Sequence, residues 1–278
     1  MNDNLIHWNV DPEIFWITDS FPLKYYGLFW ILGLTLGYYI VQRIYKKEDV
    51  PTEQLEQLAS YIFVGILLGA RLGHCLFYDF EYYSEHLLEI VLPIREVNGS
   101  YQFSGFQGLA SHGGVVGAII AIAYYWKKTK TNLLWMLDRV SIGGAVTAAF
   151  IRLGNLMNSE IYGKPTDGSW GFVFERDDLI PRHPTQLYEA VAYLVIFAVL
   201  AFLYRKRTAT TRNGLLVGML FILLFSARFI IEFFKENQVG FEDTMTLNMG
   251  QWLSVPFVVF GLLLVFRKDN RVAKETLS

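Results

Sequence analysis

Residues able to do chemistry gather where the apolar segments of this 278-residue chain end. In AFIRLGNLMNSEIYG, residues 149–163, polar side chains follow an apolar run. If a helix continues here, about 100° per residue places Arg152, Asn155, Ser159 and Glu160 within one arc about 140° wide. A guanidinium, amides and a carboxylate on one face favour a site for a polar, anionic molecule. The alternative is a polar helix end that only meets water.

Two further clusters contain residues suited to acid–base chemistry or anion binding. SHGGVVGA, residues 111–118, places His112 before three glycines, and an unperturbed imidazole titrates near neutral pH. PRHPTQLYE, residues 181–189, places Arg182 and His183 just before a predicted helix start. For His112 the alternative is a hydrogen-bonded contact between helices, which is the commoner role of a lone membrane histidine.

Four arginines lie within or at the ends of apolar segments: Arg71, Arg139, Arg152 and Arg228. An arginine near the centre of a membrane helix costs about 2.5–3.5 kcal/mol on insertion scales, so such residues are functional candidates. Ion pairing is the alternative, because Glu232 follows Arg228 by four residues and Asp138 precedes Arg139. For Arg139 we favour ion pairing.

The elements that carry these residues are expected to lie in a membrane. Hydrophobic residues make up 53% of the chain and charged residues only 18%, against about 25% charged residues in a soluble domain. The net charge of −2 gives no indication of nucleic-acid binding. The single cysteine, Cys75, excludes an intrachain disulfide and a thiolate metal cluster, and is expected to be buried.

Neither a bound metal nor a cofactor is expected. The histidines and carboxylates do not show the spacing of a metal-ligand motif such as HExxH. The first 20 residues are polar and acidic without a basic region, so we expect no removable signal peptide.

Seven apolar segments have about the length that a helix needs to cross a bilayer. They run approximately from Tyr25 to Tyr45, Leu55 to Tyr78, Leu109 to Trp126, Leu133 to Leu153, Thr185 to Tyr204, Gly214 to Phe234 and Gly250 to Phe266. A shorter amphipathic segment, His86 to Ile94, is expected to lie at the interface. In the fourth segment's continuation, Gly154 is expected to let another helix approach closely.

The distribution of basic residues predicts the orientation. One set of connections holds Arg43, Lys46, Lys47, Lys127, Lys128, Lys130, Arg205, Lys206, Arg207, Arg212, Arg267, Lys268, Arg271 and Lys274. The opposite connections hold Asp79, Glu81, Glu85, Glu89, Asp177, Asp178, Glu242 and Asp243. We therefore predict an all-α polytopic membrane protein of one domain, with the N-terminus outside, the C-terminus cytoplasmic, and outer-face elements at about 79–108, 154–184 and 235–249.

Several motifs together resemble those of the bacterial prolipoprotein diacylglyceryl transferases. They are YYGL (Tyr25 to Leu28), HGGVVG (His112 to Gly117), RLGNLMNSEIYG (Arg152 to Gly163), RHPTQLYE (Arg182 to Glu189), RFIIEFF (Arg228 to Phe234), and the GARLGHCLFY and GQWLSVP segments. The resemblance covers nearly the whole chain in order. That family has seven spans and an outside N-terminus, in agreement with the predicted topology.

The resemblance implies an enzyme of the bacterial cytoplasmic (inner) membrane. It would move the diacylglyceryl group of phosphatidylglycerol to the thiol of the lipobox cysteine of a preprolipoprotein, and release glycerol phosphate. The family's catalytic positions fall on Tyr26, His112, Arg152 and Arg228. Its headgroup-binding positions fall on Arg152, Asn155, Glu160, Gly163 and Arg228.

The chain departs from the family's pattern at two places. Leu224 stands where the family often has a tyrosine, and FQGLASHGG replaces a tryptophan and a methionine-serine-phenylalanine run before the histidine. The first change removes one hydroxyl from the expected site, and leaves the arginines in place.

The expected chemistry explains these residue types. Only the thiolate of a cysteine is a good nucleophile, so His112 is expected to take the thiol proton. Arg152 and Arg228 would neutralise the leaving phosphate, Asn155 and Tyr26 would donate hydrogen bonds, and Glu160 would orient an arginine. The alternatives are a lipid or anion transporter, an intramembrane protease and a purely structural assembly protein.

Overall fold

The computed structural model describes residues 4–18, 21–97, 99–103, 108–206, 212–236 and 245–267. The helices are α1 (Tyr25–Lys47), α2 (Thr52–Phe77), α3 (Phe80–Glu85), α4 (Leu87–Val91), α5 (Ser111–Thr129), α6 (Leu133–Met157), α7 (Thr185–Lys206), α8 (Leu215–Ile231), the 3-10 turn η1 (Glu232–Phe234) and α9 (Met249–Phe266). Short strands lie outside the helices: β1 (Leu5–Trp8), β2 (Glu13–Thr18), β3 (Phe21–Lys24), β4 (Ile94–Val97), β5 (Ser100–Phe103), β6 (Gly171–Phe174) and β7 (Pro181–Arg182).

Six helices among the described residues are long and apolar enough to cross a membrane: α1, α2, α6, α7, α8 together with η1, and α9. The prediction of a mostly helical, multi-pass membrane protein is confirmed. The third predicted span also forms a helix, α5, but it is not among these six. Seven spans and the orientation of the termini therefore stay predictions.

Some predicted features lie outside the described residues. They are residues 104–107 of the first predicted outer-face element, residues 237–244 of the third, Arg207, and the basic tail residues Lys268, Arg271 and Lys274. The predicted amphipathic segment from His86 to Ile94 is divided, because α4 covers Leu87–Val91 and β4 begins at Ile94. Its place at a membrane interface stays a prediction.

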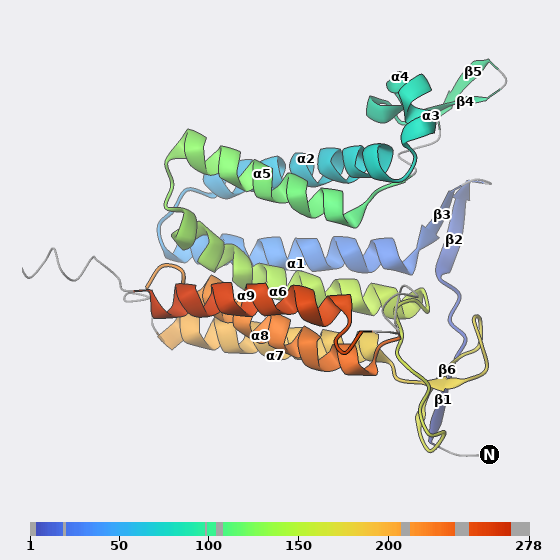
Figure 1. Ribbon diagram of the computed structural model, residues 1–278. Coiled ribbons are helices and arrows are strands. Elements are labelled where there is room, and N and C mark those ends of the chain that lie inside the picture. The colour runs from blue at the N-terminus through green and yellow to red at the C-terminus, as the bar shows by residue number, and fades with distance from the viewer. Residues whose placement is uncertain are drawn as a thin grey trace, which may run out of the picture. The chain divides into compact units, whose positions relative to one another are not determined.

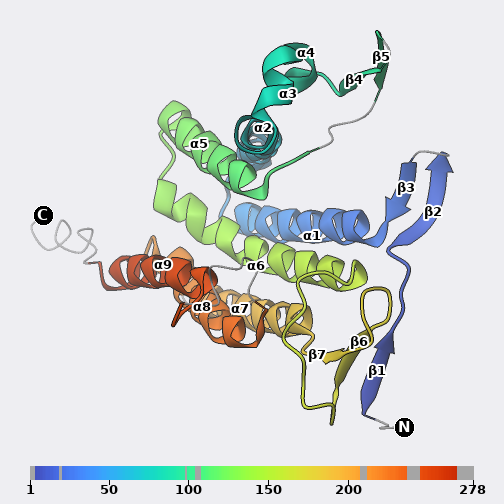
Figure 2. The same cartoon turned by 45° about the vertical axis from the view of Figure 1, so that its right-hand side comes forward.

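The chain forms two compact units, Met1–Ile44 with Leu134–Ser278, and Tyr45–Leu133. In the first unit, α8 packs along both α7 and α9 (Figure 1). The same unit contains a sheet in which β1 pairs in parallel with β6, and β6 pairs antiparallel with β7 (Figure 2). The sheet thus ties the N-terminal strand to the segment between α6 and α7.

Small residues bring α1 and α6 close together in the first unit. A Cβ atom built on Gly143 of α6 would lie 2.5 Å from the carbonyl oxygen of Gly37 and 2.8 Å from Cγ2 of Val41. The hydroxyl of Thr147 donates a hydrogen bond of 2.9 Å to the carbonyl oxygen of Gly33. Without glycine at these positions the two backbones could not approach this closely. This contact sets the position of the end of α6, which carries Arg152.

The second unit is built on a close contact between α2 and α5. A Cβ atom on Gly113 would meet the carbonyl oxygen of Gly69, and one on Gly117 would meet that of Gly65. The glycines that follow His112 in the sequence are therefore packing positions for α2. Cys75 is buried, as predicted.

Arg71 also belongs to the packing of the second unit. Its Nε donates to the carbonyl oxygen of Ile90 at 3.3 Å and its Nη1 to that of Gly108 at 3.4 Å, while Nη2 donates to the carbonyl oxygen of Glu89. The guanidinium also lies 4.7 Å from the ring centroid of Tyr83. Carbonyl oxygens and a ring thus make up much of its surroundings, which gives Arg71 a structural role.

We expect alanine substitutions at two adjacent glycines of α6 to have opposite effects on the free energy of unfolding. Gly143→Ala should destabilise the protein by about 1–3 kcal/mol, because the new methyl group overlaps backbone and side-chain atoms of α1. Gly144→Ala is the matched control, since nothing lies within 4 Å of its Cβ position, and it should be neutral or stabilising by up to about 1 kcal/mol. Thermal unfolding in detergent measures both. Equal unfolding temperatures for the two variants would contradict this packing.

Candidate active site

The helix carrying Arg152 runs four residues past Leu153, the predicted end of this span, and stops at Met157. Ser159 and Ile161 adopt left-handed backbone conformations with φ of 54° and 60°. The helix therefore does not continue through Ser159 and Glu160, and the arc that a continued helix would give them does not form. The backbone turns back instead, with a hydrogen bond of 3.1 Å from the amide of Glu160 to the carbonyl oxygen of Asn155. A sharp helix end of this kind is decided by local backbone geometry, which the polar pattern does not encode.

Because of this turn, Glu160 is connected to Arg152 by hydrogen bonds through the side chain of Asn155. Nη1 of Arg152 donates to Oδ1 of Asn155 at 3.1 Å, and Nδ2 of Asn155 donates to Oε1 of Glu160 at 2.7 Å. Nδ2 of Asn158 also donates to the same carboxylate oxygen at 3.3 Å. Both ends of the Asn155 amide are thus engaged, and its side chain joins the guanidinium to the carboxylate.

A carboxylate from α7, Glu189, accepts contacts from three cations. Its side chain is fully buried, with 0% exposed surface. Nε of Arg152 lies 2.9 Å from its Oε2, while Nη1 of Arg228 and Nζ of Lys235 lie 3.7 Å and 3.0 Å from its Oε1. The Glu189 cluster, defined as Arg152, Glu189, Arg228 and Lys235, thus joins α6, α7, α8 and the residue after η1.

The sequence pattern does not predict a role for Glu189 or Lys235. Glu189 ends the RHPTQLYE motif and Lys235 directly follows RFIIEFF, so both lie at the edge of a motif. A charged residue at the start of a predicted span was the available signal. Its partners are 37 or more positions away along the chain, and only the folded bundle identifies them.

The ion pair that the sequence offers as an alternative, Arg228 with Glu232, is not among the ion pairs of the described residues. Arg228 pairs instead with Glu189 at 3.7 Å, and Glu232 pairs with Lys235 at 3.5 Å. The carboxylate of Glu232 lies against Gly250 in the first turn of α9. A helix N-terminus stabilises a negative charge there.

The cluster carries more positive than negative charge. Arg152, Arg228 and Lys235 are paired with the carboxylates of Glu189 and Glu232, which leaves one positive charge among these five described residues. The side chains of Arg152 and Arg228 keep 16% and 29% of their surface exposed. The carboxylates of Glu189 and Glu232 therefore leave one positive charge unpaired among these five residues, with Glu160 linked to Arg152 only through Asn155, and part of each arginine side chain stays exposed.

Two further predicted residues lie next to this cluster. A Cβ atom on Gly154 would lie 3.0 Å from Cδ2 of Tyr26, so the tyrosine of α1 packs against α6 two residues after Arg152, as the expected close approach requires. Gly163 pairs with Lys235 in a β-bridge, and a Cβ atom there would lie 2.7 Å from Cγ2 of Thr185. Gly163 thus packs the chain against the segment that carries Lys235.

The remaining predicted residues lie in other surroundings. His112 belongs to the second unit, in the first turn of α5, and its side chain is exposed. Leu224 packs against the buried core of the first unit. A hydroxyl beside the arginines comes from Tyr193 of α7, which is buried and donates to Oε1 of Glu189 at 3.3 Å.

Arg182 and His183 connect the segment between α6 and α7 to the end of α8. Arg182 donates to Oδ2 of Asp178 at 2.9 Å and 2.6 Å and forms an ion pair of 2.5 Å with Glu236. The ring of His183 lies 5.2 Å from that of Phe234, and burial lowers its pKa. Both residues are packed into the protein, and neither is part of the Glu189 cluster.

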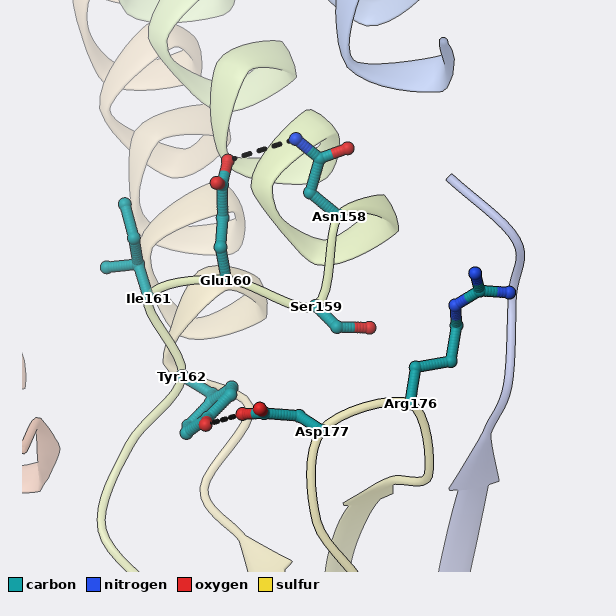
Figure 3. Close-up of a pocket in the computed structure, with 7 residues that line it drawn as sticks. All are labelled: Asn158, Ser159, Glu160, Ile161, Tyr162, Arg176 and Asp177. Carbon is teal, nitrogen blue, oxygen red and sulfur yellow. Dashed lines mark hydrogen bonds between the residues drawn. The ribbon is translucent and has the colours of Figure 1, made fainter. Parts of the chain in front are cut away.

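A pocket of about 420 Å³ lies beyond Glu160. Figure 3 shows its lining: Asn158, Ser159, Glu160, Ile161, Tyr162, Arg176 and Asp177. We call it the α6 loop pocket. The hydroxyl of Tyr162 donates to the carboxylate of Asp177 on one side of it (Figure 3). Glu160 therefore borders the pocket and is also hydrogen-bonded to Asn155.

The fold and the site define a class of protein: a polytopic membrane protein with a pair of partly exposed arginine side chains at one end of the helices of its first unit. A family model described as prolipoprotein diacylglyceryl transferase matches residues 12–267, and the chain belongs to this family of transferases. The resemblance found in the sequence is confirmed.

Three relatives align with this chain over almost their whole length. The phosphatidylglycerol–prolipoprotein diacylglyceryl transferase of Bacteroides fragilis is 48% identical over 262 residues, which cover 94% of each chain. That of Tolumonas auensis is 47% identical over 271 residues, 97% of this chain and 100% of the relative. That of Chloroherpeton thalassium is 40% identical over 274 residues, 98% of each chain.

The Arg182–Asp178 pair predicts a pH dependence of stability. Hydrogen bonds from Arg182 lower the pKa of the Asp178 carboxyl below its ordinary value. The pair therefore stabilises the fold above the unfolded-state pKa of about 4 and loses this contribution as pH falls through the lower, folded-state pKa. We expect Asp178→Asn to unfold at a lower temperature than the wild type at pH 6 and the difference to shrink toward pH 3. A constant difference across this range would contradict the assignment.

Proposed function

We propose that this chain transfers the diacylglyceryl group of phosphatidylglycerol to the lipobox cysteine thiol of preprolipoproteins in the bacterial inner membrane. The Glu189 cluster and the family match carry the proposal. The relatives are named for phosphatidylglycerol, an anionic lipid, and the cluster together with Glu232 has one uncompensated positive charge and two partly exposed arginine side chains. In this proposal the lipid phosphate supplies the missing anion.

Arg152 and Arg228 bind the phosphate in this mechanism. Glu189 holds Nε of Arg152 and Asn155 holds Nη1, so the plane of that guanidinium is defined before substrate arrives. We assign its Nη2 to the phosphate, because a fixed fork of donors matches phosphate oxygens. Glu160 and Asn155 orient Arg152, and Tyr26, which packs against Gly154 of the same helix, is assigned as a hydrogen-bond donor to the headgroup.

The transfer step forms one bond and breaks one. The cysteine sulfur attacks the glyceryl carbon of the lipid, a C–S bond forms, and the C–O bond to phosphate breaks with its electron pair leaving on glycerol phosphate. The thiol proton passes to the imidazole of His112, since only the thiolate is a good nucleophile. Charge develops on the leaving phosphate, where oriented guanidiniums stabilise the transition state more than the ground state.

The position of the cluster favours an enzyme over a transporter. Arg152 lies near the end of α6, Glu189 in the second turn of α7, and Arg228 in the last turn of α8. All three therefore lie at the same end of the packed helices of the first unit (Figure 1). A transporter site is expected near the middle of the membrane. We place this end at the outer face of a single seven-span domain with an outside N-terminus.

The direct test is transfer by the purified full-length protein. With phosphatidylglycerol vesicles and a lipobox peptide, mass spectrometry should detect the peptide carrying one diacylglyceryl group. Arg228→Ala should lower kcat at least about 100-fold, because it removes charge that faces the leaving phosphate. Arg43→Ala is the control. Arg43 is exposed near the C-terminal end of α1, so this variant should keep wild-type activity. Full activity of Arg228→Ala would refute the phosphate role.

The charge balance of the cluster can be tested separately. Glu189→Gln should lower kcat about 10- to 100-fold, since Arg152 and Arg228 lose the carboxylate that orients them. Lys235→Met added to Glu189→Gln restores the excess of one positive charge. If Glu189 acts by orientation, the double variant regains stability but not kcat. Recovery of kcat would show instead that only the net charge matters.

A further inference from the structure

The α6 loop pocket has the opposite charge character to the Glu189 cluster. Two carboxylates line it, those of Glu160 and Asp177, against one guanidinium, that of Arg176. Arg176 itself lies 3.2 Å from Oδ2 of Asp11, so part of its charge is already balanced. The pocket is therefore net negative, and an anionic lipid headgroup would be repelled there.

The lining also contains polar atoms whose hydrogen bonds are incomplete. Oδ1 of Asn158 and Oγ of Ser159 are covered by protein and have no hydrogen-bond partner among the described residues. Figure 3 shows the Ser159 side chain directed from the loop toward the side of the pocket formed by Arg176. Buried oxygens without partners are costly, so this loop carries unsatisfied polar groups next to the pocket.

We propose that the α6 loop pocket binds the polypeptide acceptor, on the residues that follow its modified cysteine. This inference rests on the proposed function, which requires one anionic lipid and one polypeptide. A peptide backbone offers both N–H donors and carbonyl acceptors. The pocket matches this combination, with the carboxylates of Glu160 and Asp177 as acceptors and Arg176 as donor.

Glu160 connects the pocket to the lipid site. Its carboxylate borders the pocket and accepts from Asn155, and Asn155 accepts from Arg152. A peptide held in the pocket therefore lies one amide side chain away from the guanidinium assigned to the phosphate. This arrangement places the cysteine of a bound acceptor near the lipid, while the opposite charges of the two sites keep the two substrates apart.

The experiment compares two acceptor peptides that share the same lipobox. One ends at the cysteine as an amide, and the other continues for four uncharged residues. With the wild-type protein in phosphatidylglycerol vesicles, we expect kcat/KM to be about tenfold higher for the extended peptide, the effect of one or two added hydrogen bonds. Asp177→Lys and Arg176→Ala should each bring this ratio close to one.

Asp167→Lys is the matched control, because Asp167 is exposed in the same α6–α7 segment but does not line the pocket. It should keep the tenfold ratio. An equal rate for both peptides with the wild type, or a preserved ratio in Asp177→Lys and Arg176→Ala, would overturn the inference. So would a lower KM for phosphatidylglycerol in Asp177→Lys with the peptide ratio unchanged, since the pocket would then bind lipid. Absence of any transfer by the wild type would instead refute the proposed function.

Discussion

The structure of the first unit depends on one buried carboxylate and the cations around it. Glu189 has no exposed surface, and an isolated charge in such a place would be strongly destabilising. Arg152, Arg228 and Lys235 make it tolerable, and in doing so they fix the ends of α6 and α8 against the start of α7. The interaction that orders the helices therefore also orients the arginines for their proposed task.

Two other buried charges among the described residues hold segments of the fold together. Asp138 has no exposed surface, and its carboxylate accepts from the backbone amides of Gly214 and Val217 at 2.8 Å and 2.9 Å, where α8 begins. Arg71 donates to the carbonyl oxygens of a neighbouring segment. Arg152 and Arg228 differ from these two because their cluster has an unbalanced positive charge and part of each side chain is exposed. Burial of a charge is thus a weaker indicator of function than incomplete compensation.

Asn155 links two sites of opposite charge. On one side lies the positive Glu189 cluster, and on the other the net-negative α6 loop pocket, which shares Glu160 with the hydrogen-bonded chain. The end of α6 makes this possible, because the left-handed residues Ser159 and Ile161 turn Glu160 back toward the helix. An uninterrupted helix would have left Glu160 unable to join both sites.

The sequence by itself determined the membrane class, most helix positions and the family, and it predicted roles for Arg152 and Arg228. Apolar length and motif order are local properties, so they can be read along the chain. Only the tertiary structure decided which charges meet: Glu189 and Lys235 lie 37 and 83 residues after Arg152 in the sequence and contact it or its partner in space. It also decided the path of the chain after α6, since the left-handed residues Ser159 and Ile161 turn the backbone and hydrogen bonds from Thr185 and Gln186 of α7 hold the turn. Ion-pair partners depend on how whole helices pack together, and the periodicity within one segment does not predict that packing.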